Sequence, residues 1–336
     1  MSTILAIETS CDETAVAVLR GTKLLASEIA SQTSEHEQYG GVVPEVASRN
    51  HLIHAPKLLR VAIAKAAIEL SQIDAFAATA GPGLASSLMI GASIAKGLAL
   101  GLKKPYLAIN HLEGHLLSPF FGSTFEVKPN VSLIVSGGHT LLVEVRALGE
   151  YRVLGRTVDD AAGEAFDKVA KMLGLSYPGG PEVERRARLG DSARFNLPRS
   201  MLDSGNHNFS FSGLKTAVRY LLEKLALSAV PDDSLVNDVC ASFQAAVIDV
   251  LTKKTMHAAR SCGAKTVTLS GGVSCNQELR KQLHAACEKA GMVLLAAESQ
   301  LCTDNAAMIA FAAALRFNSG LQSKVVDEID PNLALA

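Results

Sequence analysis

The arrangement of apolar and polar residues repeats along the chain. Residues 3–20 form two apolar runs around a polar segment, and residues 131–145 repeat this plan around a small polar turn. Each stretch predicts two strands joined by a turn. A strand, a glycine turn and a helix are predicted for residues 73–100, and the same order returns at residues 265–283. The pattern therefore indicates two copies of one α/β unit.

Other periodic stretches predict the elements between these copies. Apolar residues recur at helical spacing in residues 45–70, where Pro56 predicts either one kinked helix or two shorter helices. Residues 105–109 are typical of a short strand. An apolar helix is expected to end near residue 317, with Thr303 or Asp304 as its N-cap. The residues after Gly320 are polar and acidic without periodicity, so we expect a loosely ordered tail.

Length and composition favour a two-domain protein of a reducing compartment. The chain has 336 residues, of which 48% are hydrophobic, and its formal net charge is −1. This length predicts two domains, and the charge means that any contact with nucleic acid needs a local basic patch. The six cysteines include no Cys-x-x-Cys pair, which favours free thiols. The first residues lack the pattern of a signal or transit peptide, so we expect a cytoplasmic protein.

One stretch approaches the length of a membrane span. Residues 81–102 are largely apolar, but they contain Lys96 and are rich in glycine and alanine. These features favour a buried helix of a protein without membrane contact.

Two histidines supply the first candidate chemistry. His111 and His115 are four residues apart, a spacing that places both imidazoles on the same face of a helix. Imidazole pairs bind zinc, iron, copper or nickel, usually with a third ligand from elsewhere. A chance pair on a helix is the alternative. Leu112 stands where zinc proteases carry their general-base glutamate, which argues against a protease of that class.

Small polar turns at the ends of apolar strands are candidates for binding a phosphate. Ser10 lies in the first such turn, and the Ser-Gly-Gly turns at 136–138 and 270–272 offer close backbone approach. Together they favour a nucleotide-like ligand, although ordinary hairpin tips and tight strand-to-helix packing explain each turn equally well.

Two charged stretches have both a functional and an ordinary interpretation. Asp160, Glu164 and Asp167 share one stripe of a predicted helix, which is also typical of a solvated face with lysine partners. A run of arginines between residues 185 and 199 could contact phosphates, but such a run is more often a solvated helix face. The members of this run are Arg185, Arg186, Arg188, Arg194 and Arg199.

The motifs, taken together, resemble those of the TsaD family, the tRNA N6-adenosine threonylcarbamoyltransferases once labelled O-sialoglycoprotein endopeptidases. The resemblance runs from about residue 3 to residue 317 in uninterrupted order. The motifs include ETSCDET at 8–14, AGPG at 80–83, HLEGH at 111–115, VSGGHT at 135–140, DDAAGEAFDK at 159–168, YPGGP at 177–181, FSFSGLK at 209–215, SGGVSCN at 270–276 and CTDN at 302–305.

The resemblance implies an α/β protein of the actin-like, Hsp70-like class, with duplicated ribonuclease-H-like domains around a central cleft. We expect an N-terminal domain at 1–129 with the metal ligands, a C-terminal domain at 130–320 with the substrate site, and a tail at 321–336. Asp304 matches the family aspartate that joins His111 and His115 around one divalent metal. Fe²⁺ is the favoured metal and Zn²⁺ the alternative.

The implied activity is an acyl transfer. The family moves a threonylcarbamoyl group from threonylcarbamoyl-adenylate to N6 of an adenosine adjacent to the anticodon, in tRNAs that read codons beginning with adenine. Its bacterial members act with TsaB-like and TsaE-like partner subunits. The positions that match the family's substrate contacts are Ile134, Val135, Ser136, Gly137, Gly138, Asp167, Gly180 and Asn276.

Three other functions compete with this one. They are a metalloprotease, an ATPase or kinase of actin-like fold, and a non-catalytic scaffold of that fold. The sequence departs from many bacterial members at its end, because the tail lacks their Arg-Trp-Pro-Leu ending and the chain has no tryptophan. The resemblance therefore implies nothing about contacts made by the tail.

Overall fold

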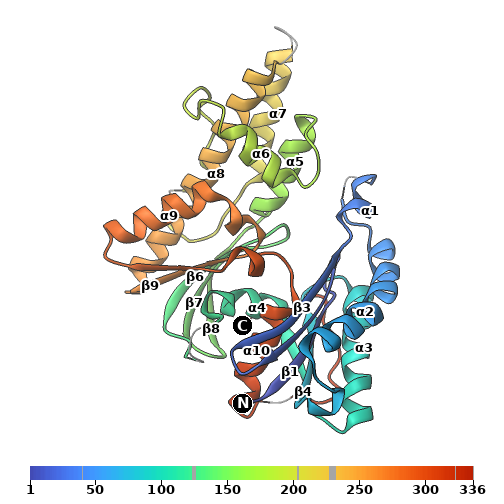
Figure 1. Cartoon of the computed structure of the whole chain (residues 1–336). Helices are drawn as coiled ribbons and strands as arrows, with labels where there is room; N and C mark the ends of the chain where they lie inside the picture. The colour runs from blue at the N-terminus through green and yellow to red at the C-terminus, as the bar shows by residue number, and fades with distance from the viewer. Residues whose placement is uncertain (40, 123–125, 203, 227–231, 322, 336) are drawn as a thin grey trace. The chain divides into compact units, whose positions relative to one another are not determined.

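A computed structural model describes residues 1–39, 41–122, 126–202, 204–226, 232–321 and 323–335 (Figure 1). It divides into two compact units. Unit 1 comprises Met1–Val127 together with Ala297–Ala336, and unit 2 comprises Lys128–Ala296. Each unit is built around its own five-stranded sheet.

The sheet of unit 1 has the order β3-β2-β1-β4-β5. Its strands are β1 (Thr3–Glu8), β2 (Glu13–Arg20), β3 (Lys23–Ser31), β4 (Ala75–Gly81) and β5 (Tyr106–Asn110). β2 pairs antiparallel with β1 and β3, whereas β1, β4 and β5 are parallel. The carboxyl ends of these three strands therefore meet at one edge of the sheet.

The sheet of unit 2 has the equivalent order β8-β7-β6-β9-β10. Its strands are β6 (Asn130–Val135), β7 (Thr140–Ala147), β8 (Glu150–Arg156), β9 (Thr266–Ser270) and β10 (Val293–Ala296). β7 pairs antiparallel with β6 and β8, whereas β6, β9 and β10 are parallel. The predicted duplication is therefore confirmed, strand by strand.

Helices cover both faces of the unit 1 sheet. The helices of this unit are α1 (Thr33–Glu37), α2 (Pro44–Ala66), α3 (Ala85–Leu102), α4 (His111–Leu117) and α10 (Ala306–Asn318), with short 3-10 turns η1 (Leu70–Gln72), η2 (Ser118–Phe120) and η4 (Ser299–Leu301). Leu5 and Ile7 of β1 belong to the core formed with α2 and α3. α10 packs against β1, β2, β4 and β5 from the other side (Figure 1). All six residues of β1 are buried, as expected for a strand covered on both faces.

The helices of unit 2 surround a separate apolar core, to which the sheet also contributes. They are α5 (Ala162–Met172), α6 (Gly179–Ala187), α7 (Ser212–Ala226), α8 (Asp233–Ser261) and α9 (Gln277–Lys289), with the 3-10 turn η3 (Gly272–Cys275). Val131, Leu133 and Val135 of β6 point alternate side chains into this core. Phe166 of α5 meets Phe243 of α8 edge to face there, with ring centroids 5.1 Å apart.

The predicted domain boundaries are wrong at the C-terminal end. Residues 297–320 do not belong with residues 130–296, because α10 is part of unit 1. Every residue from Ala306 to Leu315 is buried, and this apolar helix covers the unit 1 sheet. The structure therefore places Asp304, which precedes α10, in the same unit as His111 and His115.

The expectation of a loosely ordered tail is also wrong for the described residues. Asp330 N–H donates to the carbonyl of Ala80 at 2.8 Å, and Gly83 N–H donates to the carbonyl of Pro331 at 3.1 Å. The polar composition of the tail misled the prediction, because these contacts are made by the backbone.

Two helices of the described residues, α3 and α8, are long and apolar enough to cross a membrane by length and composition. α3 packs on β4 and α2, and α8 packs on α6 and α9. α8 is mostly buried, whereas α3 buries only one face, so the buried helix predicted for residues 81–102 is confirmed for that face alone.

Gly271, in the turn after β9, lies against the end of β6. We therefore expect a substitution at Gly271 to destabilise the protein. Its φ is +89°, and a Cβ there would lie 2.3 Å from the carbonyl oxygen of Val135. We expect Gly271→Ala to lower the free energy of unfolding by about 2 kcal/mol or more, through the left-handed backbone and the clash. Urea unfolding followed by circular dichroism measures the change.

The neighbouring glycine provides a matched control. At Gly272 a Cβ would meet no atom of the described residues within 4 Å. Gly272→Ala should therefore change the free energy of unfolding by less than about 1 kcal/mol. Equal losses for the two substitutions would show that the close approach of the turns does not constrain Gly271.

Candidate metal centre and nucleotide-binding edge

The candidate metal centre lies at the carboxyl edge of the parallel strands in unit 1. β5 ends at Asn110, and α4 begins at the next residue, His111. The Asn110 side chain caps the helix, since its Oδ1 accepts hydrogen bonds from the backbone N–H groups of Leu112 at 2.9 Å and Glu113 at 3.4 Å. The cap fixes the first turn of α4, and with it the position of His111.

Three predicted ligands converge at this edge. His111, His115 and Asp304 each offer one ligand atom, and these atoms lie within 4.8 Å of one another. Oδ1 of Asp304 is 3.1 Å from Nε2 of His115 and 3.4 Å from Nε2 of His111. Both imidazoles are buried. Two imidazoles and one carboxylate form a donor set that suits a divalent transition metal, so the residues fit the ion that the sequence analysis expected.

Asp304 keeps its carboxylate available because a neighbour caps α10. The side chain of Asn305 accepts a hydrogen bond from Met308 N–H at 2.9 Å. Asn305 is therefore the N-cap, and the sequence-based assignment to Thr303 or Asp304 is wrong. The shift of one residue leaves the Asp304 side chain directed toward the two histidines.

Glu8 is a further candidate site residue, which the sequence did not single out. It is fully buried at the end of β1, and its Oε2 lies 3.2 Å from Nδ1 of His111. Its carboxylate also accepts hydrogen bonds from the Thr79 hydroxyl and from Ser10 N–H. A carboxylate on Nδ1 orients the ring and leaves Nε2 to face Asp304, the arrangement found around metal-bound histidines. Its sequence signal was an acid that ends an otherwise apolar strand.

The centre concentrates opposite charges in a buried place. Burial alone would lower the pKa of His111, but the carboxylates of Asp304 and Glu8 raise it well above its ordinary value. Burial would raise the pKa of Asp304, yet the two histidines hold it well below its ordinary value. A positive charge is therefore favoured beside these carboxylates, and either a protonated His111 or a bound divalent cation would supply it.

The adjacent Cys11 does not fit a nucleophile or a thiolate ligand. Burial, together with the nearby carboxylates of Asp12 and Asp304, raises the pKa of its thiol far above the ordinary range. The thiol therefore stays protonated.

In unit 2 the predicted substrate residues gather around the carboxyl ends of β6 and β9. Gly137 and Gly138 follow β6, are exposed, and would place a Cβ within 4 Å of no atom of the described residues. Behind them α5 packs tightly, because a Cβ on Gly163 would lie 2.6 Å from the Ser136 carbonyl oxygen. Ile134 and Val135 have fully buried side chains, so only their backbone can serve a ligand.

The remaining predicted residues are Asp167 on α5, Gly180 on α6 and Asn276 at the start of α9. Oδ1 of Asp167, on α5, accepts a hydrogen bond from Gly179 N–H at 2.8 Å, which ties α5 to the start of α6, where Gly180 lies. Asn276 caps α9, accepting from Leu279 N–H at 3.0 Å. The Asn276 amide also donates to Gln244 at 2.7 Å. Asn276 therefore holds the turn after β9 in place.

The arginine run is neutralised within unit 2. Each member has a carboxylate partner at 2.8–3.2 Å: Arg185 with Glu182, Arg186 with Asp233, Arg188 with Glu184, Arg194 with Asp238 and Arg199 with Asp249. This pairing favours the solvated face over a phosphate-binding patch.

Comparison with known proteins agrees with this arrangement. The family model described as TsaD, tRNA N6-adenosine threonylcarbamoyltransferase, matches residues 23–311. A protein of that name from Thermosipho africanus is 47% identical over 332 residues, which cover 99% of both chains. Another from Aromatoleum aromaticum is 51% identical over 318 residues, covering 94% of this chain and 92% of that protein.

Solved structures show the likeness at the level of the fold. HypF from T. kodakarensis matches with a TM-score of 0.65 at 15% identity, covering 96% of this chain and 49% of that one. The activator of 2-hydroxyisocaproyl-CoA dehydratase from Clostridium difficile matches with a TM-score of 0.52 at 14% identity, covering 96% and 98%. The predicted actin-like class of duplicated α/β domains is confirmed. With its family model and its full-length relatives in agreement, the chain belongs to the TsaD family of tRNA N6-adenosine threonylcarbamoyltransferases.

Proposed function

We propose that the chain transfers the threonylcarbamoyl group of threonylcarbamoyl-adenylate to N6 of an adenosine adjacent to the anticodon, in tRNAs reading codons that begin with adenine. Family membership supports the reaction. The observation in this chain that carries the proposal is the convergence of His111, His115 and Asp304 at the carboxyl edge of β1, β4 and β5.

The reaction needs no protein nucleophile. The N6 amine attacks the carbamoyl carbon of the mixed anhydride, a carbon–nitrogen bond forms, and the bond from that carbon to the phosphate oxygen breaks. AMP leaves with the electron pair, and the amine gives up a proton. The protonated thiol of Cys11 is consistent with direct transfer. The protein therefore contributes binding, orientation and charge stabilisation.

We propose that one divalent metal per chain, Fe²⁺ in preference to Zn²⁺, is held by His111, His115 and Asp304. When bound, it would act as a Lewis acid and template for the donor. Glu8 holds the imidazole of His111 in the orientation that directs Nε2 toward this position.

The exposed turn at Gly137 and Gly138 is the proposed contact for the donor's phosphate, because backbone N–H groups can approach an anion there without obstruction by side chains. These groups would also stabilise the charge of the departing AMP. Ile134 and Val135 would contribute only their backbone at the end of β6. Asp167 ties α5 to the start of α6, where Gly180 lies, and Asn276 holds the turn after β9.

The proposed activity also implies an acceptor, an adenosine of tRNA, and partner subunits. An adenosine in an anticodon loop is unstacked enough to be presented directly. We propose that TsaB-like and TsaE-like subunits complete tRNA binding and turnover in the cytoplasm. The arginine run adds no support for a tRNA contact, since each of its side chains is paired with a carboxylate.

A metalloprotease is disfavoured by the fate of Glu113, the only acid between the two histidines. Its carboxylate is fully buried and is held at two points by Arg316 of α10, at 2.7 Å from Nε and 3.1 Å from Nη2. A carboxylate clamped in this way does not serve as a general base. An actin-like ATPase or kinase resembles this chain only in its fold, so the fold alone does not favour that function.

The proposed function predicts the effect of removing a ligand. Asp304→Asn and His115→Ala should each lower the affinity for Fe²⁺ by about 100-fold or more and abolish modified adenosine on tRNA, because each removes one of three ligands. Metal analysis and nucleoside mass spectrometry, with supplied threonylcarbamoyl-adenylate, measure the two effects. His54→Ala, on α2, is the control and should retain both.

Two results would contradict this assignment. One is full metal content and full tRNA modification in both ligand variants. The other is phosphoryl transfer to a small hydroxyl acceptor by wild-type protein that forms no modified adenosine.

The Glu113–Arg316 pair generates a separate prediction. Arg316→Met should lower the free energy of unfolding by about 3 kcal/mol, because it leaves a buried carboxylate without its partner. Adding Glu113→Gln should recover most of that loss in a double variant, as measured by urea unfolding. Glu113→Gln alone should retain tRNA modification per folded molecule. Casein cleavage by wild type that disappears in Glu113→Gln would instead support the protease.

A further inference from the structure

The last described residues, 323–335, form what we call the C-terminal strap, which runs along the sheet of unit 1. Its first residue pairs with β5, since Ser323 N–H donates to the Tyr106 carbonyl at 3.2 Å and the Ser323 hydroxyl accepts from Ala108 N–H at 2.9 Å. Farther along, the Asp330 and Pro331 backbones bond to the end of β4 and the turn after it. The strap therefore crosses from β5 to the edge that carries the metal centre.

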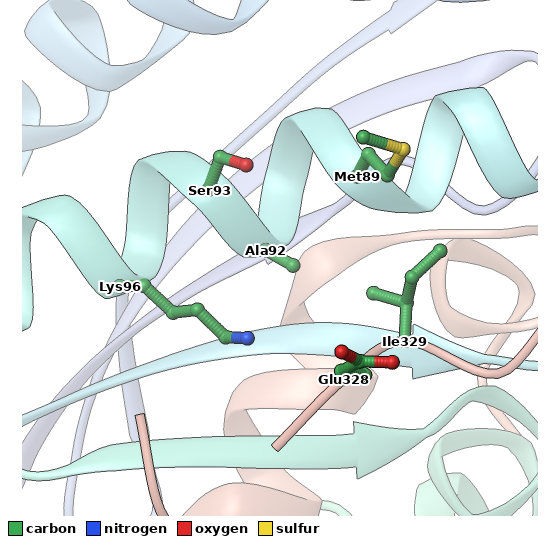
Figure 2. A pocket seen from close by; sticks show the side chains of 6 residues that line it. All are labelled: Met89, Ala92, Ser93, Lys96, Glu328 and Ile329. Atoms are coloured by element: carbon green, nitrogen blue, oxygen red, sulfur yellow. The ribbon is translucent and has the colours of Figure 1, made fainter. Parts of the chain in front are cut away.

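The middle of the strap is fastened to α3. Glu328 and Ile329 lie opposite Met89, Ala92, Ser93 and Lys96 of α3, and together they line a groove (Figure 2). The ammonium group of Lys96 donates to the Asp327 carbonyl and lies 5.5 Å from the centre of the Tyr106 ring. The groove therefore lies between the strap and α3.

The last residue of β4 is shaped to admit the strap. Gly81 has a φ of +150°, and a Cβ there would lie 1.9 Å from the Asp330 carbonyl oxygen and 2.8 Å from Cβ of Leu333. Only a residue without a side chain allows this approach. The close contact between Gly81 and the strap therefore depends on glycine at this position.

The end of the strap reaches the residue that caps the metal-binding helix. Nδ2 of Asn110 donates to the carbonyls of Leu333 at 3.4 Å and Ala334 at 2.9 Å. Oδ1 of the same amide accepts the first N–H groups of α4. One planar side chain therefore joins the strap to the turn that carries His111.

We propose that the strap is a positioning element of the metal centre and that Asn110 is the positioning residue through which it acts. The two strap carbonyls fix the amide plane, so that Oδ1 stays on the helix N–H groups and His111 keeps its place beside Asp304. Without these acceptors the amide turns, the first turn of α4 loosens, and the ligands lose their preset geometry. The inference rests on the metal site proposed above.

Two variants separate the strap from the cap itself. Deletion of residues 333–336 removes both acceptor carbonyls and leaves Asn110 intact. Asn110→Ser keeps a neutral N-cap of comparable quality but lacks the amide that reaches the strap. Val326→Ala is the control, because Val326 lies in the strap with 80% of its surface exposed.

Co²⁺ is the probe, with affinity measured by competition against a chelator and ligand geometry by the visible spectrum. We expect each variant to bind Co²⁺ about 10- to 100-fold more weakly with an altered spectrum, as for other residues that orient metal ligands. The double variant should lose no more affinity for Co²⁺ than the single variant that binds it more weakly, because both changes break the same hydrogen bonds. Val326→Ala should match wild type.

Each other outcome overturns a defined part of the account. Wild-type affinity and spectrum in both variants would overturn the role of the strap and leave the metal site standing, as would a fully additive double variant. A wild-type protein that binds no Co²⁺, or binds it as Asp304→Asn does, would overturn the metal site and the inference with it. Asn110→Ser keeps the whole strap, so it decides the question if the shortened chain does not fold.

Discussion

Glu8 is a carboxylate buried without exposure to solvent, and the site in unit 1 is arranged around the need to compensate it. An ionised group in such a place is costly unless it is paired and hydrogen-bonded. Thr79 and Ser10 supply hydrogen bonds, and His111 supplies an imidazole. His111 in turn faces Asp304, so a chain of alternating acid and base runs from β1 to the start of α10.

The parallel strands make this chain of contacts feasible. Because β1, β4 and β5 run in one direction, Glu8, the turn at Gly81 and Asn110 all arrive at one edge of the sheet. Unit 2 repeats the geometry with different chemistry, since β6 and β9 bring glycine turns to the equivalent edge. Duplication of one α/β unit has thus produced an acidic, metal-suited edge and an open, anion-suited edge, in agreement with the general placement of ligands at the carboxyl ends of parallel strands.

Much of this fold is visible in the sequence, because strand and helix periodicity report which faces are buried. The two hairpins, the strand–glycine–helix units and the pair at His111 and His115 could all be predicted in this way. Periodicity does not report which sheet an apolar helix covers, so α10 was assigned to the wrong domain. Most hydrogen bonds that fasten the strap are made by its backbone N–H and carbonyl groups, and the pattern of side chains carries no sign of them. Asp304 is more than one hundred residues from the histidines, so only the resemblance to a family indicated it.

We propose that His111, His115 and Asp304 together hold a divalent metal, and X-ray absorption at the iron edge of wild-type protein reconstituted with Fe²⁺ tests this proposal. The spectrum should show a first shell of nitrogen and oxygen atoms, with multiple scattering from two imidazole rings. A sulfur shell, or scattering from one imidazole or none, would contradict it.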